Sequence, residues 1–119
     1  MFSAKETAYL ESQTLARIAT ASKDKLQPDV VPVGFDFDGT YFYVSGFDLP
    51  RTLKYKNVQN NPKVSLVVDD LVSMDLWTVR GIKVHGVADL TTYEGYAGPG
   101  TYIRIEPKKK WSWGLETPN

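Results

Sequence analysis

Residues 30–46 read VVPVGFDFDGTYFYVSG, and they contain two runs of alternating side chains on either side of an Asp-Gly pair. An Asp-Gly pair between two such runs is a strong signal for a β-hairpin. Pro32 and Gly34 interrupt the first run, because proline has no main-chain hydrogen to donate and glycine has no side chain to pack. We therefore expect antiparallel strands over 30–37 and 41–45, with a place in the first where another group can approach the backbone.

The rest of the chain extends this pattern without a repeat. Further strands are expected over 15–20, 63–69, 79–90 and 101–105, with loops over 70–78 and 93–100 and a tail over 108–114. Gly81 and Gly86 are expected to form bulges in the long strand. Helices are expected over about 4–13 and 51–61, from the capping box of Ser3 and Glu6 and from the flanking prolines Pro50 and Pro62. The sequence predicts a mainly β, six-stranded antiparallel barrel with a few short helices, in one domain spanning 1–119.

Composition excludes several classes of function. Lys plus Arg and Asp plus Glu both number 14, so the chain lacks the basic surplus of a nucleic-acid-binding protein. It has no cysteine, which excludes disulfides, thiol nucleophiles and cysteine zinc sites. We expect no metal site and no membrane span, since the apolar runs fall far short of the roughly 20 residues that a span needs. With no N-terminal signal segment, a cytoplasmic location is expected.

One segment carries the features of an anion site. The strand ending at Ser45 and Gly46 is followed by a predicted helix that begins with Arg51, Thr52 and Lys54. Helix N-termini offer free amides to anions, and these side chains add a guanidinium, a hydroxyl and an ammonium. We interpret the segment as a phosphate pocket; the alternative is a basic helix face in solvent.

Two further features suggest a flat ligand. The main chain at Pro32, Val33 and Gly34 could lie against a planar ring, although a proline that protects an edge strand from aggregation would look the same. Trp77 lies in a predicted loop, and Trp111 and Trp113 lie near the C-terminus. These rings would pack on a partner subunit or a flat ligand, or they would close the barrel.

Together these segments resemble a known family. The matching pieces are LARIAT at 15–20, VVPVGF at 30–35, TLKYKNVQNNPKVSLVVDD at 52–70, RGIKVHG at 80–86 and SWGL at 112–115. In this order they resemble the pyridoxamine 5'-phosphate oxidase-like split-barrel family, and within it the flavin- and deazaflavin-dependent oxidoreductases. The arginine- and histidine-rich substrate end of the oxidases themselves is absent, so vitamin B6 oxidation is not expected.

The resemblance implies a homodimer with cofactor sites at the subunit interface, where FMN or the deazaflavin coenzyme F420 exchanges a hydride with a small organic substrate. The ring would lie on Pro32, Val33 and Gly34, with Trp77 and Trp113 reaching it from the other subunit. The phosphate would be held at the strand-to-helix junction by Arg51, Thr52 and Lys54. Further cofactor-binding residues are expected at Ser45, Gly46 and Asn57.

Other functions stay open at this point. The same fold could serve as a non-catalytic FMN or haem carrier, with His85 or a tyrosine as axial ligand. A small nucleic-acid module with stacking aromatics is a further alternative that the zero net charge opposes. No catalytic acid or base is identified, and Tyr43, Tyr55 and His85 are the candidate proton donors.

Overall fold

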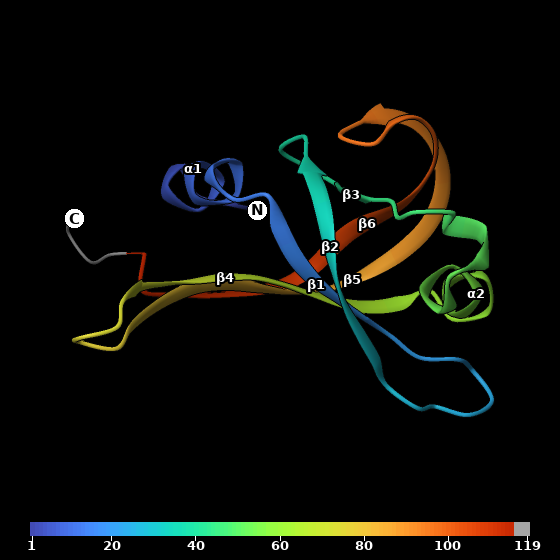
Figure 1. Cartoon of the computed structure of the whole chain (residues 1–119), viewed down its shortest axis with the longest axis horizontal. Coiled ribbons are helices and arrows are strands. Elements are labelled where there is room, and N and C mark those ends of the chain that lie inside the picture. The colour runs from blue at the N-terminus through green and yellow to red at the C-terminus, as the bar shows by residue number, and fades with distance from the viewer. Residues whose placement is uncertain (116–119) are drawn as a thin grey trace.

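The computed structural model describes residues 1–115 and shows a closed barrel of six antiparallel strands (Figure 1). The strands follow one another around the barrel in the order β1-β2-β3-β6-β5-β4, and β4 pairs with β1 to close it. The elements are α1 (Ala4–Ser12), β1 (Leu15–Thr20), β2 (Asp29–Phe37), β3 (Phe42–Val44), the 3-10 turn η1 (Leu49–Arg51), α2 (Leu53–Asn60), β4 (Lys63–Ser73), β5 (Thr78–Gly95) and β6 (Gly98–Trp113). The predicted fold class is confirmed.

The β2–β3 hairpin leaves one side of the barrel partly open. Its turn has Gly39 at a φ of 100°, in the region that favours glycine, and the amide of Asp38 donates to the carbonyl of Tyr41 over 3.1 Å. Because β3 is only three residues long, it pairs with β2 only along 35–37. Residues 29–34 of β2 therefore pair with β1 on one edge, and no described strand pairs with the other.

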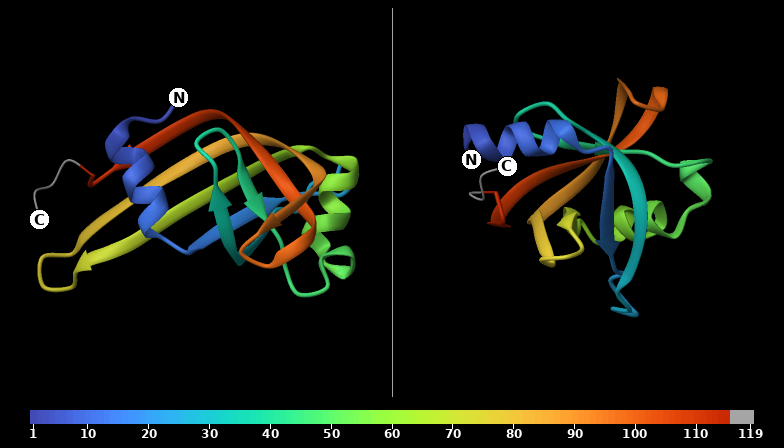
Figure 2. Two further views of the ribbon diagram at one scale, coloured as in Figure 1. Left: turned by 90° about the horizontal axis from the view of Figure 1, so that it is seen from above. Right: turned by 60° about the vertical axis from the view of Figure 1, so that its left-hand side comes forward.

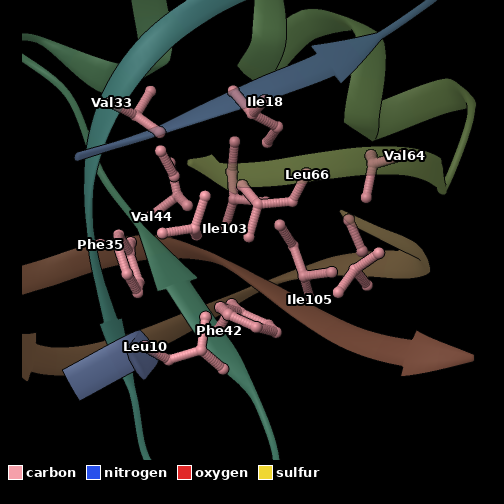
Figure 3. Packing of buried hydrophobic residues seen from close by; sticks show 14 of the residues in the cluster. Leu10, Ile18, Val33, Phe35, Phe42, Val44, Val64, Leu66, Ile103 and Ile105 are labelled. Atoms are coloured by element: carbon pink, nitrogen blue, oxygen red, sulfur yellow. The ribbon is translucent and has the colours of Figure 1, made fainter. Parts of the chain in front are cut away.

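The barrel interior is filled by apolar side chains from all six strands (Figure 3). Alternate residues of β1 and β4, such as Ile18 and Leu66, point into it, as the period of two in a strand requires. Helix α1, which begins with the predicted capping box, contributes Leu10 to the same core. The carboxylate of Glu6 accepts hydrogen bonds from the amide of Ser3 and from the ammonium of Lys110. Because Lys110 belongs to β6, the second bond joins α1 to the sheet.

Three predicted boundaries were wrong, the first because polar residues are paired across strands. The predicted loop over 70–78 is mostly strand, since Asp69 and Asp70 form ion pairs with Arg17 and Arg80. The loop over 93–100 is the β5–β6 hairpin, and the last strand runs to 113 instead of 105. The lysine-rich tail is therefore sheet, in which Trp111 packs against Lys83 of β5.

Smaller differences concern one helix and two glycines. The helix predicted from 51 starts as η1, and α2 begins only after Thr52, whose hydroxyl accepts the amide hydrogen of Tyr55. The register of β5 and β6 shifts at Gly86, as predicted for a bulge. Gly81 stays in register instead, and a Cβ there would lie 2.6 Å from the Trp113 ring.

Strands β4, β5 and β6 continue beyond the barrel as an arm (Figures 1 and 2). The tip of the β4–β5 hairpin and helix α2 lie at opposite ends of the molecule, whose longest dimension is 42 Å. Neither α1 nor α2, the α-helices in the described part of the chain, is long and apolar enough to cross a bilayer.

Candidate functional site

A cavity of about 600 Å³ lies at the free edge of β2. Its walls come from β2, from the segment that leaves β3, from the start of α2 and from the β5–β6 turn. The lining residues are Pro32, Val33, Gly34, Ser45, Gly46, Phe47, Asp48, Thr52, Lys54, Tyr96 and Ala97. The structure thus brings together most of the residues that the sequence singled out on the ring side and on the phosphate side.

Lys54 supplies the positive charge of this cavity. The residue is only 7% exposed, yet among residues 1–115 its ammonium makes no hydrogen bond or ion pair. Burial lowers its pKa, and the negative charge of Asp29 acts in the opposite direction. A Cβ on Gly46 would lie 2.8 Å from Nζ, so the missing side chain makes room for the ammonium. The side chain is thus mostly buried while its ammonium still meets the open space of the cavity, and a cation placed in this way without a protein partner favours an anionic ligand at this end.

The other end of the cavity is formed by main chain and by one aromatic ring. Pro32 and Gly34 lie on the free edge of β2, while the side chain of Val33 is buried in the barrel, which leaves its main chain facing the cavity. The Tyr96 ring covers Gly34, and a Cβ on Gly34 would lie 2.7 Å from its Cε2 atom. The hydroxyl of Tyr96 accepts the amide hydrogen of Ser45 over 2.7 Å.

Sequence reasoning missed Tyr96, together with Phe47, Asp48 and Ala97. Tyr96 belongs to the glycine-rich stretch over 93–100, for which the sequence predicts a loop. The signal that could have found it is the spacing of Gly95 and Gly98, which leaves two residues for a tight hairpin turn between two alternating runs.

Four predicted site residues lie outside this cavity. The side chain of Arg51 is 87% exposed and its Nε is 3.2 Å from the carboxylate of Asp48. Asn57 is buried and donates to the hydroxyl of Thr20 over 3.0 Å, which ties α2 to β1. Trp77, at 69% exposed, lies in the β4–β5 turn, and Trp113, at 37%, is the last residue of β6. These parts of the arm lie at the end of the molecule opposite α2 (Figure 1).

None of the three candidate proton donors lines the cavity. Tyr43 stacks on Tyr93 and donates to Asp38 over 2.9 Å; burial and this carboxylate raise the pKa of Tyr43 to about 12. Tyr55 packs against the core, and His85 lies on the outer face of the barrel with its ring 4.7 Å from that of Trp111.

Comparisons with known proteins agree with this geometry. The model of the pyridoxamine 5'-phosphate oxidase family matches residues 2–107. A 5a,11a-dehydrotetracycline/5a,11a-dehydrooxytetracycline reductase of Streptomyces rimosus is 35% identical to this chain. The alignment covers 97% of this chain and 84% of the reductase.

Solved structures with the same fold carry different functions. The haem storage protein HutZ of Vibrio cholerae has a TM-score of 0.72 at 14% identity, over 93% of this chain and 95% of its own. An F420 reductase has a TM-score of 0.62 at 21% identity, over 82% of this chain and 89% of its own.

The short β3 and the cavity at the free edge of β2 define a split β-barrel protein with a cavity in the split. With the match over 2–107 and the reductase relative, the chain belongs to the pyridoxamine 5'-phosphate oxidase family.

Proposed function

We propose that this protein is an oxidoreductase that binds a flavin-type cofactor, either coenzyme F420 or FMN, and exchanges a hydride with a small organic substrate. The observation that carries the proposal is the cavity itself, in which the ammonium of Lys54, which has no hydrogen bond or ion pair among the described residues, and an open strand edge face the same space. The reductase relative supports redox chemistry, and its name supports a polycyclic organic substrate.

The residues present fit such a cofactor at both of its ends. A flavin or deazaflavin has a planar ring with polar edges and a phosphate on a flexible chain. Lys54 would hold the phosphate through a charge-assisted hydrogen bond, in the space that Gly46 leaves free. The main chain of Pro32, Val33 and Gly34 would lie against the ring, and Thr52 would line the chain between the two ends.

When bound, the cofactor would supply the hydride chemistry, while the protein orients and shields it. The unpaired edge of β2 would offer main-chain polar groups to the charge that develops on a reduced ring, and fixed donors are most effective at such a position. The family resemblance leans towards F420, whose acidic tail would favour nearby lysines such as Lys56 and Lys63.

We also propose that the protein acts as a homodimer. The arm carries an exposed apolar row, namely Val72, Met74, Leu76, Trp77 and Val79. An exposed patch of this kind commonly marks an interface. A largely apolar groove of about 460 Å³ on the outer face of the barrel, with His85 and Val87 in its lining, offers a second surface for a partner subunit. In the dimer, Trp77 and Trp113 of one subunit would reach the cavity of the other.

A haem carrier is the second candidate, because the haem storage protein shares this fold. His85 is the one histidine of the chain and lies at the edge of the outer groove. Haem bound there would show an absorbance band that disappears in a His85→Ala variant, and it would leave the Lys54 cavity free.

Fluorescence titration of the purified protein with FMN and with F420 tests the proposal. We expect tight binding of one of them, and binding weaker by about tenfold or more in Lys54→Met, since a hydrogen bond to a charged group contributes roughly 1.5–3 kcal/mol. Lys25→Met is the matched control, because Lys25 is exposed between β1 and β2 and does not line the cavity. Binding of neither cofactor, or equal binding by Lys54→Met, would contradict the proposal.

A further inference from the structure

Tyr96 differs from the other tyrosines in how its hydroxyl is used. The hydroxyls of Tyr9 and Tyr43 donate to carboxylates, and that of Tyr102 donates to the carbonyl of Gly98. The Tyr96 hydroxyl instead accepts from the amide of Ser45 over 2.7 Å, and no acceptor among residues 1–115 takes its hydrogen. One donor is therefore left over at the wall of the cavity.

The turn that carries Tyr96 holds this donor in place. The Tyr102 hydroxyl accepts from the amides of Gly95 and Ala97, over 3.2 and 3.0 Å, and donates to the carbonyl of Gly98 over 2.7 Å. The amide of Tyr96 itself donates to the carboxylate of Asp36 on β2 over 2.6 Å. The position of the hydroxyl is thus set by the fold, which is what a preorganised binding group needs.

The surroundings of the ring keep it both fixed and accessible. The Tyr96 ring packs on Gly34, and any larger residue at position 34 would displace the ring. Tyr96 nevertheless remains 45% exposed. It also lines a neighbouring cavity of about 360 Å³ with Phe35, Asp36 and Leu10, so it separates two spaces. Burial raises the pKa of Tyr96, with the Ser45 amide acting in the opposite direction, and the hydroxyl keeps its proton at neutral pH.

We propose that the Tyr96 hydroxyl donates a hydrogen bond to an acceptor atom, a carbonyl oxygen or a ring nitrogen, of the planar ring bound in the cavity. The proposal rests on the proposed function, because it requires a flavin-type ring there. The amide of Ser45 polarises the hydroxyl and strengthens the bond it gives. Since negative charge grows on such a ring upon reduction, the same hydrogen bond favours the reduced form and raises the reduction potential of the bound cofactor.

The test compares Tyr96→Phe, which keeps the ring on Gly34 and removes only the hydroxyl, with the wild type. Tyr41→Phe is the control, because Tyr41 lies in the β2–β3 turn and lines neither cavity. Each protein is titrated with FMN and F420, and the reduction potential of the bound cofactor is measured against a reference dye. Equal thermal unfolding midpoints would show that the variants are folded.

We expect Tyr96→Phe to bind about threefold to tenfold more weakly, the effect of losing one hydrogen bond, or to hold its cofactor at a more negative potential. Tyr41→Phe should match the wild type in both measurements. If the wild type binds a cofactor and Tyr96→Phe equals it in affinity and in potential, the role of Tyr96 is overturned while the proposed function stands. If the wild type binds neither cofactor, both are overturned.

Discussion

Gly46 shows how a single residue can shape the cavity without touching the core. Its Cα faces the ammonium of Lys54, and a Cβ would lie 2.8 Å from Nζ. Because Nζ is the far end of a flexible side chain, Gly46→Ala should displace the ammonium at small cost to folding. We expect the unfolding midpoint to change little, whereas the affinity for the phosphate-bearing cofactor falls about tenfold.

Gly39→Ala is the contrasting control for Gly46→Ala. Gly39 has a φ of 100°, with no atom within 4 Å of its Cβ position. Alanine there should lower stability through backbone strain and leave the affinity unchanged. An affinity loss at Gly39, or none at Gly46, would show that the ammonium does not hold the ligand.

The sequence reveals charged and turn-forming residues of the site better than it reveals aromatic ones. Lys54 and Gly46 could be predicted because a strand end followed by a helix start is visible in the sequence. For Tyr96 the spacing of Gly95 and Gly98 indicates the hairpin turn, but not that this turn brings the ring onto Gly34, more than sixty residues earlier in the chain. Arg51 was predicted in the same segment as Lys54, but a 3-10 turn directs it to the surface.

At the scale of elements, alternation identified the strands but not their lengths. Strands β4, β5 and β6 continue through Asp69, Asp70 and the lysine run, whose polarity is typical of turns. The two aspartates remain in the sheet because their charges meet partners on neighbouring strands, as Asp70 meets Arg80 over 2.8 Å, whereas Lys110 of the lysine run meets Glu6 of α1. Such pairing depends on register, which single-strand patterns do not contain.

Helix α1 makes a prediction about acid stability. Burial alone would raise the pKa of Glu6, but hydrogen bonds from Lys110 and the amide of Ser3 outweigh it and lower the pKa from 4.5 to about 2. A carboxyl with a lowered pKa stabilises the fold above its unfolded pKa and loses that contribution as the pH falls. Glu6→Gln should therefore be less stable near neutral pH, by at most about 3 to 4 kcal/mol at roughly 1.4 kcal/mol per pKa unit.

The pH dependence distinguishes this charge effect from simple loss of packing. The difference in unfolding free energy between the wild type and Glu6→Gln, measured with urea, should narrow progressively as the pH drops below 4.5. Glu11→Gln is the control on the same helix, since Glu11 is exposed. A difference that stays constant with pH would mean that the Glu6 charge contributes nothing to anchoring α1.

At the scale of the whole molecule, the predicted site residues fall into two groups that lie far apart within one chain. The cavity lies beside α2, whereas Trp77 and Trp113 lie on the arm at the opposite end of a molecule 42 Å long (Figures 1 and 2). An antiparallel arrangement of two chains would place each arm beside the other chain's cavity. A two-fold axis produces this arrangement twice, which is how closed dimers form.

If the arm completes the cavity of a partner subunit, a variant that cannot dimerise should also lose cofactor binding. Met74 and Leu76, both largely exposed at the tip of the arm, make no contribution to the barrel core. The double variant Met74→Glu, Leu76→Glu should be monomeric in light scattering after size-exclusion chromatography, because burying two carboxylates in an apolar interface is costly. Its unfolding temperature should stay near that of the wild type if the barrel is stable as a monomer.

The control variant is Leu26→Glu, since Leu26 is also largely exposed but lies outside the arm; this variant should associate like the wild type. A monomeric double variant that binds cofactor as tightly as the wild type would show that each cavity is complete within one chain, and that the arm tryptophans do not belong to it.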